Sequence, residues 1–213
     1  MKKLIFGVIA VVMTGNLSFG QEFKTSYESY KKSTQVFYSK LNEFDKNLKT
    51  EVTNPAVFKT EESFSNWLKD NLSKTNYKNP QDAIKDYNEQ INLITEVIKK
   101  NSDFLKQLKN NEKEFLSLLA ESPLIGIPIT TVVPLPANTA LNFPCISECI
   151  NNAVKCSKDA DKTFSDTMIS SAAAFATGNV ISAAAIAYIG SRAHSRAIAA
   201  CRTTLLSCAD GCD

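Results

Sequence analysis

The C-terminal third of the chain is organised by two short stretches, CISECINNAVKC at 145–156 and CRTTLLSCADGC at 201–212. They hold all six cysteines in mirrored spacings: four then seven residues in the first stretch, seven then four in the second. Pairing them from the outside inward gives residue numbers that always sum to 357. In an antiparallel hairpin, the numbers of any two residues that face each other add up to the same value. The pattern therefore predicts three disulfides: Cys145–Cys212, Cys149–Cys208 and Cys156–Cys201.

The same spacings predict that both stretches are helical. Steps of four and seven residues keep each trio of cysteines on one face of a helix. Among the many connectivities that six cysteines allow, only the nested one satisfies both the sum and the helical face. A metal site is the alternative, because a C-x3-C pair places two thiolates one helical turn apart. Export to an oxidising compartment would favour disulfides instead.

The midpoint of the mirror coincides with a turn signal. It falls between Gly178 and Asn179, and both residue types tolerate the left-handed backbone of a tight turn. The sequence thus predicts a disulfide-linked helical hairpin over 145–213 that turns at these two residues. Small residues should line its seam: Ser170, Ala173, Ala184, Ala187 and Ser191.

Charged residues on the two predicted helices match across the same axis. Asp161 and Arg196 also sum to 357, and Asp166 and Arg192 sum to 358. We therefore expect two cross-helix ion pairs, Asp161–Arg196 and Asp166–Arg192.

Upstream of the hairpin, apolar residues recur with helical periodicity. One stripe runs over 27–52 and should end at Asn54-Pro55, since the residue before a proline leaves the helical region. A shorter helix is predicted over 61–72. A third stripe follows Asn79-Pro80, an N-cap with proline at the first helical position, and continues over 80–119. Asn101 and Glu112 are its only polar interruptions.

These stripes predict an all-α fold. A helix of ~40 residues would be roughly 60 Å long and needs a partner along its length. We expect residues 21–121 to form an elongated, coiled-coil-like helical bundle, followed by the disulfide-stapled antiparallel hairpin. Between them, 122–144 holds five of the seven prolines, which exclude a helix. Because this segment is also apolar, we expect an extended strap along the bundle or a hinge.

The N-terminus resembles a secretory signal peptide. Two lysines precede an apolar stretch over 4–13, and small residues follow up to Gly20. We expect 1–20 to be removed, because the apolar stretch is shorter than the ~20 residues of a membrane span. The mature chain would lie in the periplasm or outside the cell, and the form of the peptide suggests a Gram-negative bacterium.

Composition restricts the partners that the mature chain would bind. Loss of Lys2 and Lys3 leaves 22 basic against 22 acidic residues. A balanced charge argues against a nucleic-acid partner. His194 is the only histidine, and the sequence contains no catalytic or nucleotide-binding motif. We expect no enzyme, no catalytic residue, no metal and no cofactor. We expect His194 to be a hydrogen-bonded structural residue that projects toward Thr163 and Asp166.

Two functional hypotheses remain open. The first is a protein-binding or structural module of the cell envelope, acting on a protein partner or by self-association through helical faces. The second is a membrane-active secreted protein of bacteriocin or toxin type. Its hairpin tip would insert into a target bilayer through the uncharged stretch 167–191. The candidate contact residues of the tip are Phe175, Val180, Ile181 and Ile186.

Two resemblances accompany these hypotheses. The paired C-x3-C motifs at Cys145/Cys149 and Cys208/Cys212 resemble those of plant α-hairpinins and of small chaperones of the mitochondrial intermembrane space, which implies a shared hairpin geometry. The alanine-rich stretch 167–191 with its tight turn is similar to the hydrophobic hairpin of pore-forming colicins, which implies membrane insertion.

Overall fold

The computed structural model describes residues 2–49, 52, 54–124 and 143–212, with the backbone alone for 2–20 and 143. This part of the chain is all-α and contains no strand. Its seven α-helices are α1 (Lys2–Leu48), α2 (Glu61–Asn71), α3 (Pro80–Lys100), α4 (Ser102–Gln107), α5 (Glu112–Glu121), α6 (Phe143–Ala176) and α7 (Val180–Asp210). Three short 3-10 helices, η1 (Pro55–Phe58), η2 (Leu72–Lys74) and η3 (Leu108–Asn110), separate some of them.

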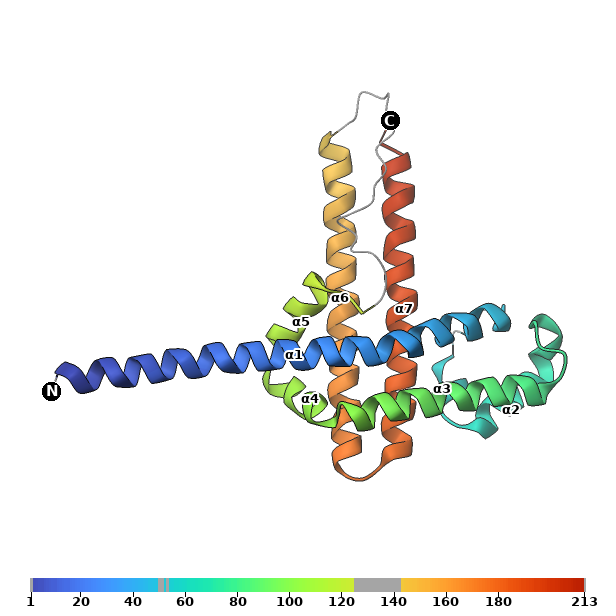
Figure 1. Cartoon of the computed structure of the whole chain (residues 1–213). Helices are drawn as coiled ribbons and strands as arrows, with labels where there is room; N and C mark the ends of the chain where they lie inside the picture. Colours follow the sequence, from blue (N-terminus) through green and yellow to red (C-terminus); the bar gives the residue numbers. More distant parts are fainter. Residues whose placement is uncertain (1, 50–51, 53, 125–142, 213) are drawn as a thin grey trace.

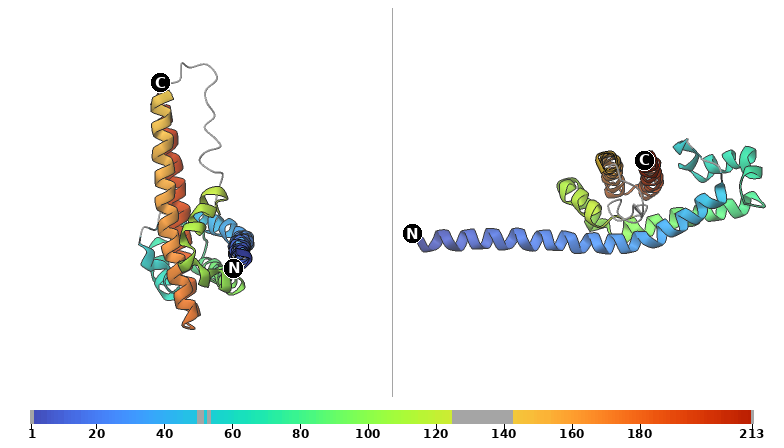
Figure 2. Two further views of the ribbon diagram at one scale, coloured as in Figure 1. Left: turned by 90° about the vertical axis from the view of Figure 1, so that its left-hand side faces the viewer. Right: turned by 90° about the horizontal axis from the view of Figure 1, so that it is seen from above.

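The helices form two groups that cross each other. Figure 1 shows α1 and α3 lying side by side in antiparallel directions, with the α6–α7 hairpin crossing them almost at a right angle. In Figure 2, α4 and α5 flank α6, and α2 lies near α7. The described N-terminal helices thus hold the hairpin from three sides.

One core is shared by both groups. The predicted stripe of α1 is buried along its whole length, from Tyr27 through Leu41 to Leu48. It packs with Phe164 and Met168 of α6, and with α7 residues such as Tyr188, in a single hydrophobic cluster. The predicted bundle and hairpin are successive segments of the chain, and they contribute side chains to the same buried cluster.

The first predicted helix ends four residues early. Lys49 has a φ of 53°, a left-handed conformation that stops α1 after Leu48. Asn76 caps this end, because its backbone N–H donates to Asn47 O at 2.7 Å and its side-chain amide donates to Lys46 O at 3.3 Å. Asn54 does not end α1 but accepts from the N–H of Ala56 at the start of η1.

The expected 40-residue helix is wrong, because two asparagines divide it. The Asn101 side chain donates to Val97 O and to Ser33 Oγ, both at 2.8 Å, and the Asn111 side chain donates to Gln107 O at 2.9 Å. Asparagine amides compete in this way with the helical backbone. The two breaks let α4 and α5 turn around α6 (Figure 1). The cap that begins α3 is as predicted: Asn79 Oδ1 accepts from the N–H of Asp82 at 2.9 Å.

Only the edges of the proline-rich stretch 122–144 are described. Leu124 is buried in the shared core. Residues 125–142 lie outside the described part of the chain, so the expectation of a strap or hinge falls there.

Candidate functional site

The hairpin is linked by the three disulfides that the cysteine mirror predicts. Cys145–Cys212, Cys149–Cys208 and Cys156–Cys201 each have a Cα–Cα distance of 5.7 Å. That distance is typical of disulfides, so the spacing between the two helices suits all three bridges. Three such bridges are typical of proteins of an oxidising compartment.

The turn also lies at the predicted residues. Gly178 has a φ of 82°, where glycine pays no steric cost. Asn179 caps α7, and its Oδ1 accepts from the N–H of Ser182 at 3.0 Å. The fold-back point is therefore specified by two adjacent residues with separate roles.

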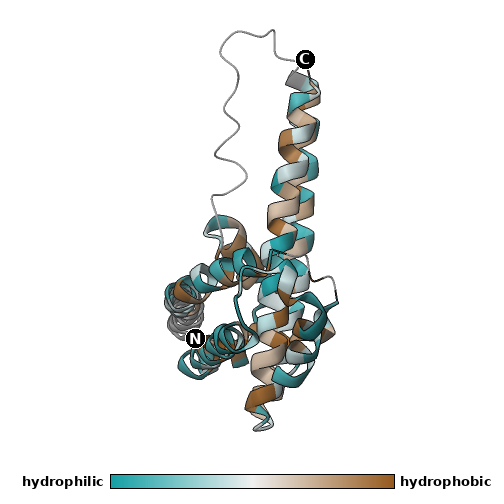
Figure 3. Ribbon diagram, turned by 90° about the vertical axis from the view of Figure 1, so that its right-hand side faces the viewer, coloured by the Kyte–Doolittle hydropathy of each residue, from teal (hydrophilic) through white to brown (hydrophobic). Residues whose placement is uncertain are grey.

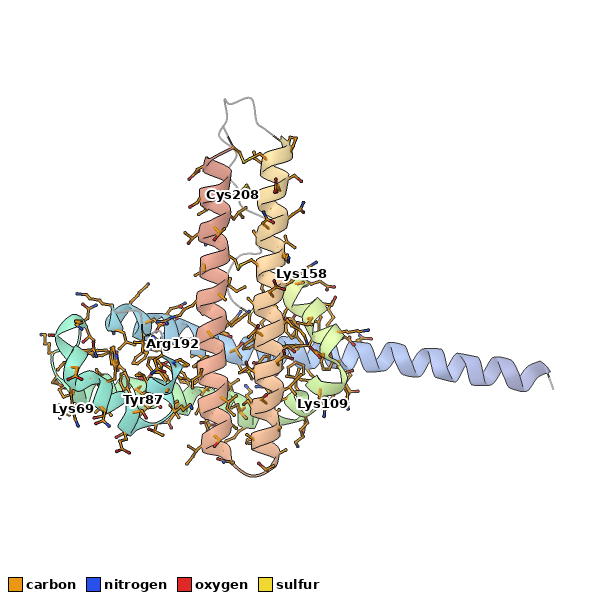
Figure 4. The ribbon with its side chains drawn as sticks, turned by 180° about the vertical axis from the view of Figure 1, so that it is seen from behind. Lys69, Tyr87, Lys109, Lys158, Arg192 and Cys208 are labelled. Carbon is orange, nitrogen blue, oxygen red and sulfur yellow. A yellow bond between two sulfur atoms is a disulfide. The ribbon has the colours of Figure 1, made fainter. Side chains whose placement is uncertain are left out.

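The disulfide-bearing half of the hairpin stands clear of α1–α5 (Figures 1 and 4). We call this half, residues 143–160 and 197–212, the arm. It has its own small buried cluster, separate from the shared core: Cys149, Ala153, Leu205 and Cys212. Leu206, on the arm surface, is 42% exposed. Two helices bury little apolar surface between them, so the bridges contribute much of the arm's cohesion.

A groove runs between α6 and α7 below the Cys156–Cys201 bridge. We call it the outer groove; its volume is about 440 Å³. Three of the six lining residues on its α7 side are alanines, and Asp159 is its only acidic residue. It is lined by Cys156, Asp159, Ala160, Thr163, Phe164, Thr167, Gly190, Ala193, His194, Ala197, Ala200 and Cys201. Seen from behind in Figure 4, the hairpin is not covered by another helix of the described chain.

Small residues bring the two helices together beside this groove. A Cβ on Gly190 would overlap the Cγ2 methyl of Thr167, so only glycine permits the observed approach. Ser171 Oγ donates to Ala183 O at 2.8 Å across the seam. Of the predicted seam residues, Ala184, Ala187 and Ser191 are buried. Ser170 and Ala173 are instead exposed.

His194 has a different partner from the expected ones. Its Nε2 lies 2.8 Å from Asp161 Oδ1, and its ring stacks on Phe164 with 4.5 Å between centroids. Its Nδ1 has no hydrogen-bond partner in the described part of the chain. Both members of the pair are more than nine-tenths buried. The pair joins α6 to α7 at the edge of the outer groove and is shielded from solvent.

Both predicted cross-helix ion pairs are wrong. Arg192 lies against α1 instead, with Nε 2.7 Å and Nη2 2.6 Å from Asp45 Oδ1. Asp166 pairs with Lys162 at 3.3 Å, within α6. Arg196 Nη1 donates to Val52 O at 2.9 Å. The two arginines face the N-terminal part of the chain, and a symmetry argument confined to the hairpin could not identify their partners.

Arg192 and Tyr188 lie in a dense aromatic cluster. The Arg192 guanidinium is 3.9 Å from the ring centroid of Phe58, a cation–π contact. Tyr188 packs edge-on against the rings of Phe58 and Tyr87. Burial raises the pKa of Tyr188 well above its ordinary value. Burial, with a smaller effect of the charge on Glu61, raises the pKa of Tyr87 to about 12. Both hydroxyls are therefore neutral at physiological pH.

The four candidate tip residues differ in exposure. Phe175 is half-buried and packs against the shared core. Val180 and Ile186 are half-buried as well, whereas Ile181 is 79% exposed. Figure 3 shows this hydrophobic end of the hairpin protruding beyond the other helices. Within the described residues, no helix combines the length and the hydropathy that a membrane span needs.

One group of potential metal ligands occurs among the described residues. The sulfurs of Cys145, Cys149 and Cys212 lie within 4.8 Å of one another. All three are engaged in disulfides, and metal ions bind thiolates. In this oxidised state the group is not a metal site.

Comparison of the whole chain with protein-family models, with curated proteins and with solved structures finds no match.

Proposed function

We propose that the chain is an exported, non-enzymatic helical protein of a bacterial cell envelope or its surroundings, which binds a protein partner through the arm and the outer groove. The observation that carries this proposal is the separation of the arm from helices α1–α5. Three disulfides fix a helix pair that supports no other described helix and has a groove on its surface.

The groove suits an α-helix as the partner element. Alanine side chains at 193, 197 and 200 leave a furrow rather than a ridge. A ridge of side chains from a third helix fits such a furrow, as in other helix packings. Because Asp159 is the only acidic lining residue and neither lysine nor arginine lines the groove, we expect an apolar rather than a strongly charged helix face.

The signal peptide supports the export part of the proposal. Cleavage after Gly20 would keep Phe23, which is buried in the shared core, in the mature chain. The disulfides agree with an oxidising compartment.

Two neighbouring alanines provide a matched test of the groove. Both are exposed on α7, but only Ala200 lines the outer groove. A photo-crosslinker at Thr163 should give one discrete adduct in the native envelope, and excess unlabelled mature protein should compete it away. Ala200→Arg should reduce the adduct at least ~10-fold, since a buried unpaired charge costs more than 1.4 kcal/mol.

Ala199→Arg is the control and should leave the adduct unchanged. Equal adduct yield from Ala199→Arg and Ala200→Arg, with circular dichroism unchanged for both, would rule out the groove as the binding surface.

A second candidate, membrane activity, is favoured by one observation, the 79% exposure of Ile181 at the tip. Insertion would require the tip to leave the shared core, which includes Met168 and packs against Phe175. Alanine and serine in 167–191 gain little from hydrocarbon compared with leucine or isoleucine. We rank this candidate below the binding module.

We expect the purified mature protein to release no dye from liposomes, because the core contacts hold the tip. Dye-release fluorescence against protein concentration measures this, with detergent as the positive control. Dose-dependent leakage that is lost on Ile181→Asp and Ile186→Asp would reverse the ranking of the two functions.

A further inference from the structure

Two of the three disulfides are close enough for their sulfurs to exchange. Cys149 Sγ and Cys212 Sγ belong to different bridges and are 3.6 Å apart. The third bridge, Cys156–Cys201, is seven residues away from Cys149–Cys208 on each helix. That spacing corresponds to about 10 Å along a helix axis. Only the two outer bridges are therefore within reach of each other.

Burial differs between the two cysteines of each outer bridge. Cys145 and Cys208 are half-buried, whereas Cys149 and Cys212 are 2% and 5% exposed. An external thiolate reaches the more accessible cysteine of a bridge, and the other cysteine is then the leaving group. Here the leaving groups are the two buried cysteines, whose sulfurs are 3.6 Å apart. A thiolate released from one bridge therefore lies beside the other bridge.

We propose that the two outer bridges form a thiol–disulfide exchange site, which accepts an external thiol at Cys145 and delivers a free thiol at Cys208. The external thiolate bonds to Cys145 Sγ, and the Cys145–Cys212 bond breaks to leave a Cys212 thiolate. Cys212 then bonds to Cys149 Sγ, and the Cys149–Cys208 bond breaks. The Cys208 thiolate takes a proton from water. Each step breaks one disulfide and forms one, so no net oxidation occurs.

A dithiol is the reactant class that completes the reaction. Its second thiol attacks the mixed disulfide at Cys145, so the dithiol is oxidised by two electrons and Cys145 becomes a thiol. The chain then holds the Cys149–Cys212 bridge and thiols at Cys145 and Cys208. Because Cys149 lies on α6 and Cys212 follows the end of α7 by two residues, the new bridge still joins the two halves of the hairpin. The site thus accepts two electrons while the end of the arm stays cross-linked.

A pair of serine variants tests the exchange step. Cys145→Ser leaves a Cys212 thiol beside the Cys149–Cys208 bridge. At pH 8, acid quench, alkylation and non-reducing peptide mapping should find both Cys149–Cys208 and Cys149–Cys212, with alkylation at Cys208 as well as Cys212. Their interconversion should speed up about tenfold per pH unit below the thiol pKa, because the thiolate is the attacking species.

Cys156→Ser is the matched control, since it also leaves one buried cysteine, Cys201, without its bridge. It should keep Cys145–Cys212 and Cys149–Cys208 intact and be alkylated at Cys201 alone.

A measurement on the unmutated chain does not depend on the folding of a variant. One equivalent of glutathione should give a mixed disulfide at Cys145 and alkylation at Cys208. Glutathione at Cys145 with alkylation confined to Cys212 would overturn the proposal. So would a Cys145→Ser protein that keeps only Cys149–Cys208 after hours at pH 8.

Discussion

Reduction of the disulfides should release the arm and leave the rest of the molecule folded. In hydrogen exchange, we expect amides in 145–160 and 197–212 to lose protection by at least ~100-fold. Amides in 164–172 and 183–192 should keep their protection together with α1 and α3. The boundary follows the two separate buried clusters, because the arm contains only the smaller one.

The size of this effect follows from loop closure. The innermost bridge spans 45 residues. In the chain-entropy model, closing such a loop contributes roughly 4 kcal/mol, about a thousandfold in an equilibrium constant, and nested bridges add less. A helix pair of this length without bridges is marginal in water. The rest of the hairpin, residues 164–172 and 183–192, acts as an internal control in the same sample. If its protection fell in step with that of the arm, the shared core would not be what holds it.

Tyr188→Ala should destabilise the whole protein by about 3–5 kcal/mol, because it removes a fully buried ring from the centre of the aromatic cluster. At ~2–4 °C per kcal/mol for a chain of this size, the midpoint of thermal unfolding should fall by about 10 °C. Urea unfolding followed by circular dichroism gives the free energy directly.

Tyr188→Phe is the matched control. It keeps the ring and removes only the hydroxyl, which has no hydrogen-bond partner in the described part of the chain. Removing an unsatisfied buried hydroxyl should change the free energy of unfolding by less than ~1 kcal/mol. A loss as large as that of Tyr188→Ala would mean that the hydroxyl, rather than the ring, is the stabilising group.

The hairpin could be predicted from the sequence because its rules are local and geometric. The constant sum of paired residue numbers defines how the two antiparallel helices face each other, and Gly178 with Asn179 defines where the chain turns. The helix breaks were visible as interruptions of the apolar stripe at Asn101 and Glu112. The helix ends there because the side-chain amides of Asn101 and Asn111 hydrogen-bond backbone carbonyls and so compete with the helical backbone. A pattern of apolar residues contains no information about this competition.

The partners of the buried charges could not be predicted in the same way. Arg192 pairs with Asp45 on α1, and no spacing rule relates residues so far apart in the sequence. The outer groove was missed for a related reason. The sequence shows small residues at 190, 193, 197 and 200. It does not show the groove, which forms only when α6 and α7 pack against each other. A step pattern of three and four residues among these positions was the available signal.

The contact between α1 and α7 has a consequence for the time course of folding. The Arg192–Asp45 bond closes a separation of 147 residues, and α7 supplies Tyr188 to the core that α1 begins. A chain emerging from its N-terminus cannot complete this core until α7 has been made. Contacts of such long sequence separation also slow folding. The apolar stripes of the N-terminal helices therefore stay exposed to solvent until α7 is synthesised and packs against them.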